Sequence, residues 1–204
     1  MKKIIVMAAM AAVLFASCGT SKKTTVSSTK SPSAAEIERG EALSDEPCIV
    51  LAEEKPVIRK YGNGQHFKEM TSRNIAEAQA LSDFARSIAA AVITATEDIG
   101  VSLDKYAGDD ETGAKVADQS GETNDFAMSV ASEIIRNTHV IKTSRYFKSN
   151  KQYNIYVCIE YMGTENQLVE QVENSVKDKI SAADREKLEQ RHDKFRQRVL
   201  SDLR

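Results

Sequence analysis

Residues 138–161, THVIKTSRYFKSNKQYNIYVCIEY, decide the fold of this chain. Two runs rich in β-branched and aromatic residues flank the polar segment Ser149-Asn150-Lys151, and this pattern predicts an antiparallel hairpin. Because side chains alternate along a strand, the odd positions from Tyr153 to Tyr161 share one face, which must pack on helices. Cys158 then lies on the opposite face of the hairpin.

Residues 66–96 have the pattern of a long amphipathic helix. Apolar residues recur in this segment at spacings of three and four, which is the period of one helix face. Alanine is frequent here, and small side chains let a sheet or a second helix approach closely. The apolar positions are Phe67, Met70, Leu81, Phe84, Ala85, Ile88, Val92 and Ala95.

The segments on either side of this helix predict shorter elements. Apolar runs at 48–51 and 57–58, interrupted by Pro56, indicate a weak strand and an edge segment. The stretch Tyr61-Gly62-Asn63-Gly64 indicates a turn. Residues 107–121 are rich in Gly and Asp, and they predict a solvated acidic loop because the spacing of an EF-hand calcium loop is missing.

Two further helical segments are expected. Thr123 or Asn124 is a favoured N-cap for a second helix, whose buried stripe comprises Phe126, Val130 and Ile134. Residues 165–203 predict a charged C-terminal helix with a break at Ser181. The apolar stripe of that helix packs on its own domain, on a second copy of the chain or on a partner protein, and all three alternatives stay open.

The first eighteen residues have the pattern of an export signal. Two lysines precede twelve apolar residues, Ile4 to Phe15, a run too short to span a membrane as a helix. The small residues Ala16 and Ser17 then precede Cys18, and this stretch resembles the lipobox of bacterial lipoproteins, with Phe15 in place of the usual Leu. The resemblance implies cleavage between Ser17 and Cys18 and a lipid on the Cys18 sulfur. The alternative is an ordinary secretory signal in which Cys18 is incidental.

A polar segment follows this signal. Residues 19–35 are rich in Ser, Thr and Lys and predict a linker whose ends lie about 20–25 Å apart. Two or more acyl chains hold a protein stably at a bilayer, whereas one holds it only marginally. By resemblance to lipoprotein sorting signals, the lack of Asp after Cys18 favours the outer membrane, and Lys22 and Lys23 favour its periplasmic side.

Together these segments predict an α+β fold, in which a long Ala-rich helix and a second helix pack on a small antiparallel sheet, followed by a long C-terminal helix. The chain of 204 residues suits a single core. We expect a signal peptide at 1–17, a lipidated cysteine and flexible tether at 18–44, an α/β domain at 45–165 and the charged C-terminal helix at 166–204. The formal net charge of −2 gives no electrostatic footprint for nucleic acid.

Residues suited to chemistry are few. Cys48 and Cys158 could form one disulfide in an oxidising compartment, or stay as two buried thiols. The histidines at 66, 139 and 192 lack the spacing of a metal site, and the motifs of a catalytic serine elbow or a phosphate-binding loop are missing. We therefore expect no catalytic residue, no metal site and no cofactor.

The lipobox, the Ala-rich stretch Asn74–Arg86 and the strand Tyr153–Glu160 together resemble the small outer-membrane lipoproteins of the Lpp-twenty type, over about residues 45–165. That resemblance implies a compact α/β domain without established catalysis, and it transfers no functional residue beyond Cys18. The long C-terminal helix departs from the pattern.

Two functions are consistent with these features. The first is a membrane-anchored structural or interaction module of the bacterial envelope, with envelope proteins or further copies of itself as partners, acting through an exposed sheet face or the C-terminal helix. The second is a periplasmic carrier or sensor that binds a small apolar ligand near Leu81, Ile88 and Ile155.

Overall fold

The structure, a computed structural model, describes residues 45–103 and 119–204. All of these residues belong to one compact unit, which comprises residues 31–204. The expected signal peptide, Cys18, the tether and most of the expected loop at 107–121 lie outside the described residues.

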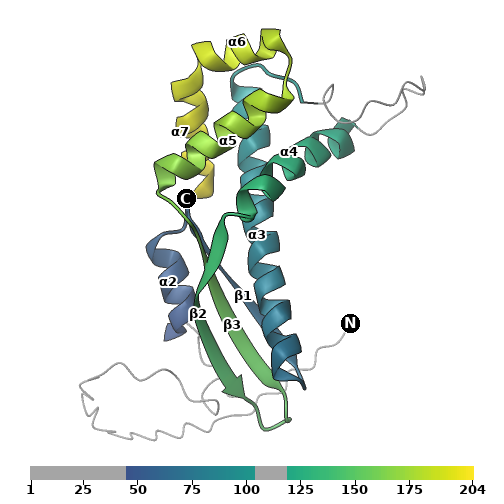
Figure 1. Cartoon of the computed structure of the whole chain (residues 1–204), viewed down its shortest axis with the longest axis vertical. Helices are drawn as coiled ribbons and strands as arrows, with labels where there is room; N and C mark the ends of the chain where they lie inside the picture. Colours follow the sequence, from purple (N-terminus) through teal and green to yellow (C-terminus); the bar gives the residue numbers. More distant parts are fainter. Residues whose placement is uncertain (1–44, 104–118) are drawn as a thin grey trace, which may run out of the picture. The chain divides into compact units, whose positions relative to one another are not determined.

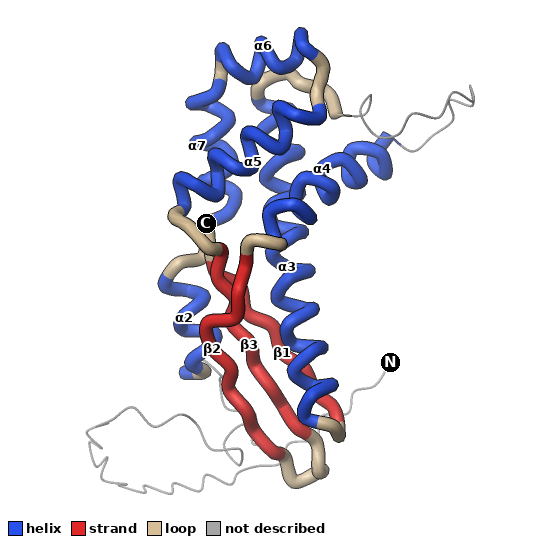
Figure 2. Tube along the Cα trace, viewed as in Figure 1, coloured by secondary structure: helices blue, strands red, loops and turns tan. Residues whose placement is uncertain are grey.

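The described residues form six helices and a three-stranded sheet, which confirms the predicted α+β class (Figures 1 and 2). In chain order the elements are α2 (Pro47–Glu54), β1 (Arg59–His66), α3 (Glu69–Asp98), α4 (Gln119–Ile135), β2 (Thr138–Phe147), β3 (Tyr153–Tyr161), α5 (Glu165–Lys179), α6 (Ala182–Gln190) and α7 (His192–Leu203).

The sheet is antiparallel throughout, with strand order β1-β3-β2. β2 and β3 form the expected hairpin, in which Phe147 pairs with Tyr153 beside the turn. On β3, Ile155, Val157 and Ile159 are buried in the main core against α3, as the alternation predicts. Cys158 lies in a smaller cluster on the other face, beneath α2.

The predicted turn at 61–64 is wrong, because these residues are the middle of β1. Both glycines there lie directly against α3. A Cβ on Gly62 would lie 2.0 Å from the carbonyl oxygen of Ala76, and one on Gly64 would lie 2.0 Å from that of Ser72. The glycines therefore serve close strand–helix packing and not a change of chain direction.

The predicted strand at 48–51 is also wrong, because these residues belong to helix α2. Glu46 caps the helix by accepting a hydrogen bond from the Cys48 backbone N–H, and Pro47 occupies the first helical position, where its missing N–H costs nothing. The expected edge segment at 57–58 is a buried turn, and β1 begins at Arg59. α2 packs on this second face and buries Tyr156 and Cys158, whereas Tyr61 on the neighbouring strand stays 40% exposed.

α3 is the expected Ala-rich helix, and it contacts the sheet along one part and helices α4 and α7 along another (Figure 1). α4 begins at Gln119, so the proposed caps Thr123 and Asn124 lie inside it. Its expected buried stripe is confirmed, since Phe126, Val130 and Ile134 are all in the core.

The C-terminal segment consists of three helices. The expected break is confirmed, because the Ser181 side chain accepts a hydrogen bond from the Asp184 N–H and caps α6. A second break, at Arg191, was not predicted from the spacing of residues 165–203, and it turns α7 back along α3 (Figure 1). The apolar stripe of α7, comprising Phe195, Val199 and Leu203, is buried in the main core.

Two side chains of the α7 region hold the end of α3. Arg191 Nη1 donates to the Ile99 carbonyl at 3.1 Å, and Lys194 Nζ donates to the Asp98 carbonyl at 2.6 Å. Basic groups at a helix C-terminus satisfy its free carbonyls and interact favourably with its dipole. Within the described residues, none of the helices combines the length and apolar character needed to cross a bilayer.

Candidate functional site

The residues predicted to carry the lipid anchor lie outside the described part of the chain. Ser17 and Cys18 precede Asp45, the first described residue, by more than twenty positions. The described residues offer four other places to examine: a buried cluster beneath α2, a buried ion pair between α5 and α7, a small pocket, and an exposed apolar group at one end of the sheet.

A polar cluster lies between α2 and the sheet, and we call it the α2 cluster: Glu46, Cys48, Tyr146, Tyr156 and Cys158. The Glu46 carboxylate accepts a hydrogen bond from the Tyr146 hydroxyl at 2.5 Å and another from the Cys48 N–H at 3.1 Å. Cys48 Sγ lies 3.6 Å from Ser144 Oγ. These contacts fasten the first described turn of the chain to β2.

Both thiols of the α2 cluster are free and buried, which corresponds to the second of the two alternatives for this pair. Burial raises the pKa of Cys48 to about 11, and burial together with the nearby Cys48 raises the pKa of Cys158 to about 12. Burial and the Glu46 carboxylate also raise the pKa of Tyr146. Both sulfurs are therefore protonated at neutral pH, which is the opposite of what a catalytic cysteine needs.

A buried ion pair joins α5 to α7. The Glu173 side chain is 2% exposed, and it accepts hydrogen bonds from Arg196 Nε and from Lys177, whose Nζ lies 2.9 Å away. Burial alone would raise the pKa of Glu173, but the hydrogen bonds from Arg196 and Lys177 outweigh it and hold the pKa below its usual range. The pairing explains how a carboxylate is accommodated in a helix interface, and it assigns no chemistry to this carboxylate.

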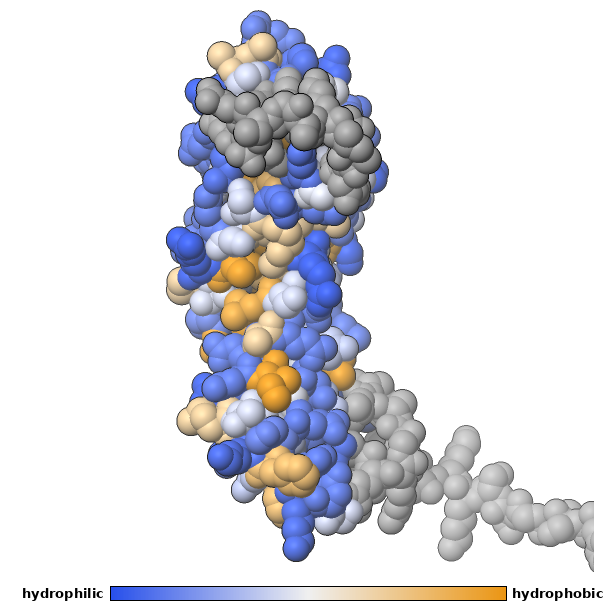
Figure 3. Space-filling model, turned by 90° about the vertical axis from the view of Figure 1, so that its right-hand side faces the viewer, coloured by the Kyte–Doolittle hydropathy of each residue, from blue (hydrophilic) through white to orange (hydrophobic). Residues whose placement is uncertain are grey.

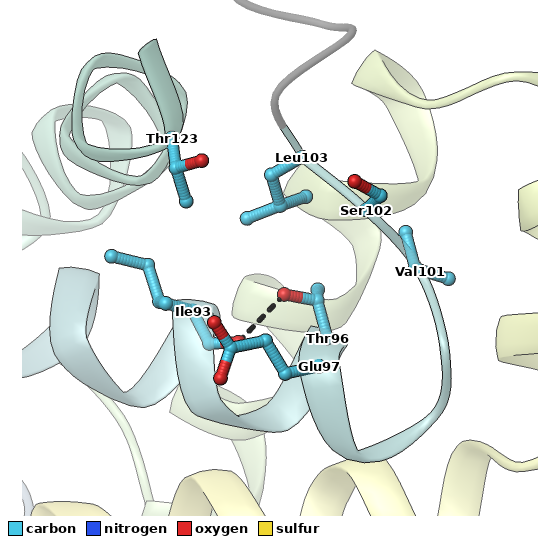
Figure 4. A pocket seen from close by; sticks show the side chains of 7 residues that line it. All are labelled: Ile93, Thr96, Glu97, Val101, Ser102, Leu103 and Thr123. Atoms are coloured by element: carbon cyan, nitrogen blue, oxygen red, sulfur yellow. Dashed lines mark hydrogen bonds between the residues drawn. The ribbon is translucent and has the colours of Figure 1, made fainter. Parts of the chain in front are cut away.

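A pocket of about 210 Å³ lies where the end of α3, residues 101–103 and α4 meet (Figure 4). Its volume is below the ~300 Å³ at which ligand pockets commonly begin. Leu103 is also the last described residue before the gap at 104–118. The lining combines apolar side chains with one carboxylate and three hydroxyls: Ile93, Thr96, Glu97, Val101, Ser102, Leu103 and Thr123.

The positions suggested for an apolar ligand belong to the packed core. Ile88 and Ile155 are fully buried, and Leu81 packs against the same cluster. The histidines are on separate elements, with His66 at the end of β1, His139 in β2 and His192 at the start of α7. Across residues 45–103 and 119–204, no three His, Cys, Asp or Glu side chains are grouped closely enough to hold a metal ion.

Phe67 and Met70 do not lie in the buried stripe predicted for residues 66–96. Phe67 precedes α3 and is 64% exposed, and Met70, in the first turn, is 67% exposed. Phe147, at the end of β2, is 55% exposed. Figure 3 shows the face that carries α3, where apolar side chains form a broken line with one group at its lower end. The helical spacing of apolar residues could not predict that these side chains are exposed. Their exposure depends on where the sheet ends.

Compared with models of protein families, with curated proteins and with solved structures, the chain matches none. The resemblance to lipoproteins of the Lpp-twenty type therefore stays a prediction.

Proposed function

We propose that this chain is a lipid-anchored module of the bacterial cell envelope, which acts through structural or protein contacts and not through catalysis. The observation that carries the proposal is the sequence of residues 1–18, in which a basic start, twelve apolar residues and two small residues lead to Cys18. By its sorting signals we place it at the outer membrane, on the periplasmic side.

The position of the first described helix supports this proposal. α2, the first helix among the described residues, begins at Pro47, and 28 residues lie between it and Cys18. A lipid on Cys18 can therefore enter a bilayer while the described elements stay outside it.

The chemistry of the buried groups supports a non-catalytic role. The α2 cluster holds α2 on the sheet, with thiols whose pKa values are raised far above neutral. The Glu173 carboxylate is bonded to Arg196 and Lys177 and joins two helices. Each of these groups is accounted for by packing.

The two surfaces expected from the sequence to contact partner proteins are covered in the structure, wholly or in part. The apolar stripe of α7 is buried on α3, and the second face of the sheet carries α2. A deletion of residues 182–204 would remove α6 and α7 and expose the core. Such a deletion could therefore not show whether α7 binds a partner protein. The solvent side of α7, which includes Gln197 and Ser201, can be changed without that effect.

The test is metabolic labelling with an alkyne analogue of palmitate, followed by membrane fractionation. We expect the natural chain to incorporate the label and to sediment with membranes, and Cys18→Ser to lose the label. Ser17→Ala is the matched control, because it keeps a small residue before the cysteine and leaves the sulfur in place. Equal labelling of Cys18→Ser would contradict the proposal.

A further inference from the structure

One end of the sheet brings together residues that are far apart in the sequence. We call residues 66–73 and 145–153 the tip; they comprise the end of β1, the first turns of α3 and the β2–β3 turn (Figure 1). His66 pairs with Tyr153 in the sheet, and Tyr153 pairs with Phe147, so three strands meet side by side here. The rings of Phe147 and Tyr153 are 5.0 Å apart.

The start of α3 is fastened to this end of the sheet. The Ser72 hydroxyl lies 2.5 Å from the Gly64 carbonyl oxygen and 3.1 Å from that of Tyr153, so it links α3 to two strands. Arg145 of β2 also pairs with Glu69 of α3 at 2.8 Å. The exposed side chains of Phe67, Met70 and Phe147 are therefore carried on a well-connected frame.

The tip is basic in an acidic chain. It holds five Lys or Arg side chains and one acidic side chain, Glu69, while the whole chain has a formal charge of −2. Among the described residues, four of these basic groups form no ion pair, whereas Arg145 is paired with Glu69. The four are Lys68, Arg73, Lys148 and Lys151.

The chain enters the described fold close to the tip. Glu46, the second described residue, accepts a hydrogen bond from the hydroxyl of Tyr146, which directly precedes Phe147. Residues 19–44 separate Cys18 from this point, and at up to about 3.4 Å per residue they are long enough for the tip to reach a bilayer that holds the lipid. The described part of the chain therefore begins close to the tip.

We propose that the tip rests on an anionic lipid surface, with Phe67, Met70 and Phe147 inserted among the headgroups and the surrounding Lys and Arg side chains against the phosphates. This inference rests on the lipid anchor proposed above and names the surface that the anchored domain contacts. Apolar side chains ringed by basic ones suit the boundary between headgroups and acyl chains, because the basic groups keep their charge in the polar layer.

The size of the apolar group favours a bilayer over a protein partner. Three side chains of this kind expose on the order of 300 Å². A stable protein interface covers about 800 Å² on each partner. A bilayer has no such requirement, because the lipid on Cys18 already keeps the domain at its surface and the tip needs only to orient it.

The test uses the lipidated full chain with a fluorophore at Ser149→Cys, in the turn of the tip. Cys48 and Cys158 are buried and protonated, and the sulfur of a lipidated Cys18 is blocked, so the label goes to the new thiol. The chain is placed in vesicles of phosphatidylethanolamine and phosphatidylglycerol, and quenching by aqueous iodide is measured. Glu189→Cys, exposed on α6 at the far end of the fold, is the reference position (Figure 1).

We expect a blue-shifted emission and several-fold lower quenching at position 149 than at 189. The double change Phe67→Ala with Phe147→Ala abolishes this protection, and vesicles of phosphatidylcholine alone reduce it. Met162→Ala is the matched control, because Met162 is 59% exposed just beyond the other end of β3 and its loss leaves the protection intact.

Three results would overturn the inference. Equal quenching at 149 and 189 while the chain stays on the vesicles would do so and would leave the lipid anchor standing. Protection unaffected by the double change would show that these side chains do not insert. Protection found only in native envelope membranes, and not in protein-free vesicles, would assign the tip to a protein partner. Failure of the anchor itself would be seen separately, as equal labelling of Cys18→Ser by the palmitate analogue.

Discussion

At the scale of single residues, Gly62 and Gly64 determine how closely α3 lies on the sheet. Because glycine has no side chain, the strand backbone can approach the carbonyls of Ala76 and Ser72. On the side of α3 that faces the strand, Ala76 and Ala80 carry small side chains. The two glycines and the Ala-rich helix are thus one packing device.

We predict that Gly62→Ala destabilises the domain by about 3 kcal/mol or more, because the new methyl would overlap the helix backbone. Gly100→Ala is the control. Gly100 has a φ of 75° with open space around it, so only its left-handed conformation is penalised, by about 1 kcal/mol. Urea unfolding measures both, and equal losses would contradict the close packing.

The thiols give a second prediction at this scale. With pKa values of about 11 and 12, Cys48 and Cys158 should react with a thiol reagent at neutral pH about a hundredfold or more slowly than an exposed cysteine such as Ser149→Cys. Unfolding the chain without reductant should then reveal two thiols. If unfolding reveals neither of them, the pair is bonded as a disulfide.

At the scale of elements, α2 and α7 cover what the sheet and α3 would otherwise expose. The apolar run at 48–51 fits a buried strand and a short helix equally well, and the helix is decided by its start, where Glu46 caps and Pro47 opens it. Glutamate is an unusual N-cap residue. Its second carboxylate oxygen accepts a hydrogen bond from Tyr146, which lies 100 residues away in the sequence and so cannot be predicted from a local pattern. α7 is placed by long-range contacts, including those of Arg191 and Lys194 with the end of α3.

The Glu173 ion pair predicts how the helical end responds to acid. Because its folded-state pKa is lowered, its stabilising effect is present above the unfolded value of 4.5 and is lost as the pH falls through the folded value. Glu173→Gln should therefore cost about 2 kcal/mol at pH 7, and the difference from the natural chain should vanish in acid. Glu170→Gln, exposed on the same helix, should show neither effect, and a loss for Glu173→Gln that is independent of pH would refute the pairing.

At the scale of the whole molecule, the α+β class, the hairpin and both faces of β3 followed from strand alternation, which a sequence displays directly. The turn assigned to 61–64 failed, because glycine signals both turns and close backbone approach, and only the neighbouring helix distinguishes them. The tip was missed for a similar reason: Phe67 and Met70 continue the helical spacing, yet they lie beyond the end of the sheet that would bury them.

The central claim is that Cys18 carries the lipid that holds this domain at a membrane. The most direct measurement is the intact mass of the chain extracted from bacterial membranes, with fragmentation of its N-terminal peptide. We predict a mature chain that begins at Cys18 and carries a diacylglyceryl group on sulfur with a further acyl chain on the amine. A chain that begins elsewhere, or that begins at Cys18 without added lipid, would contradict the account.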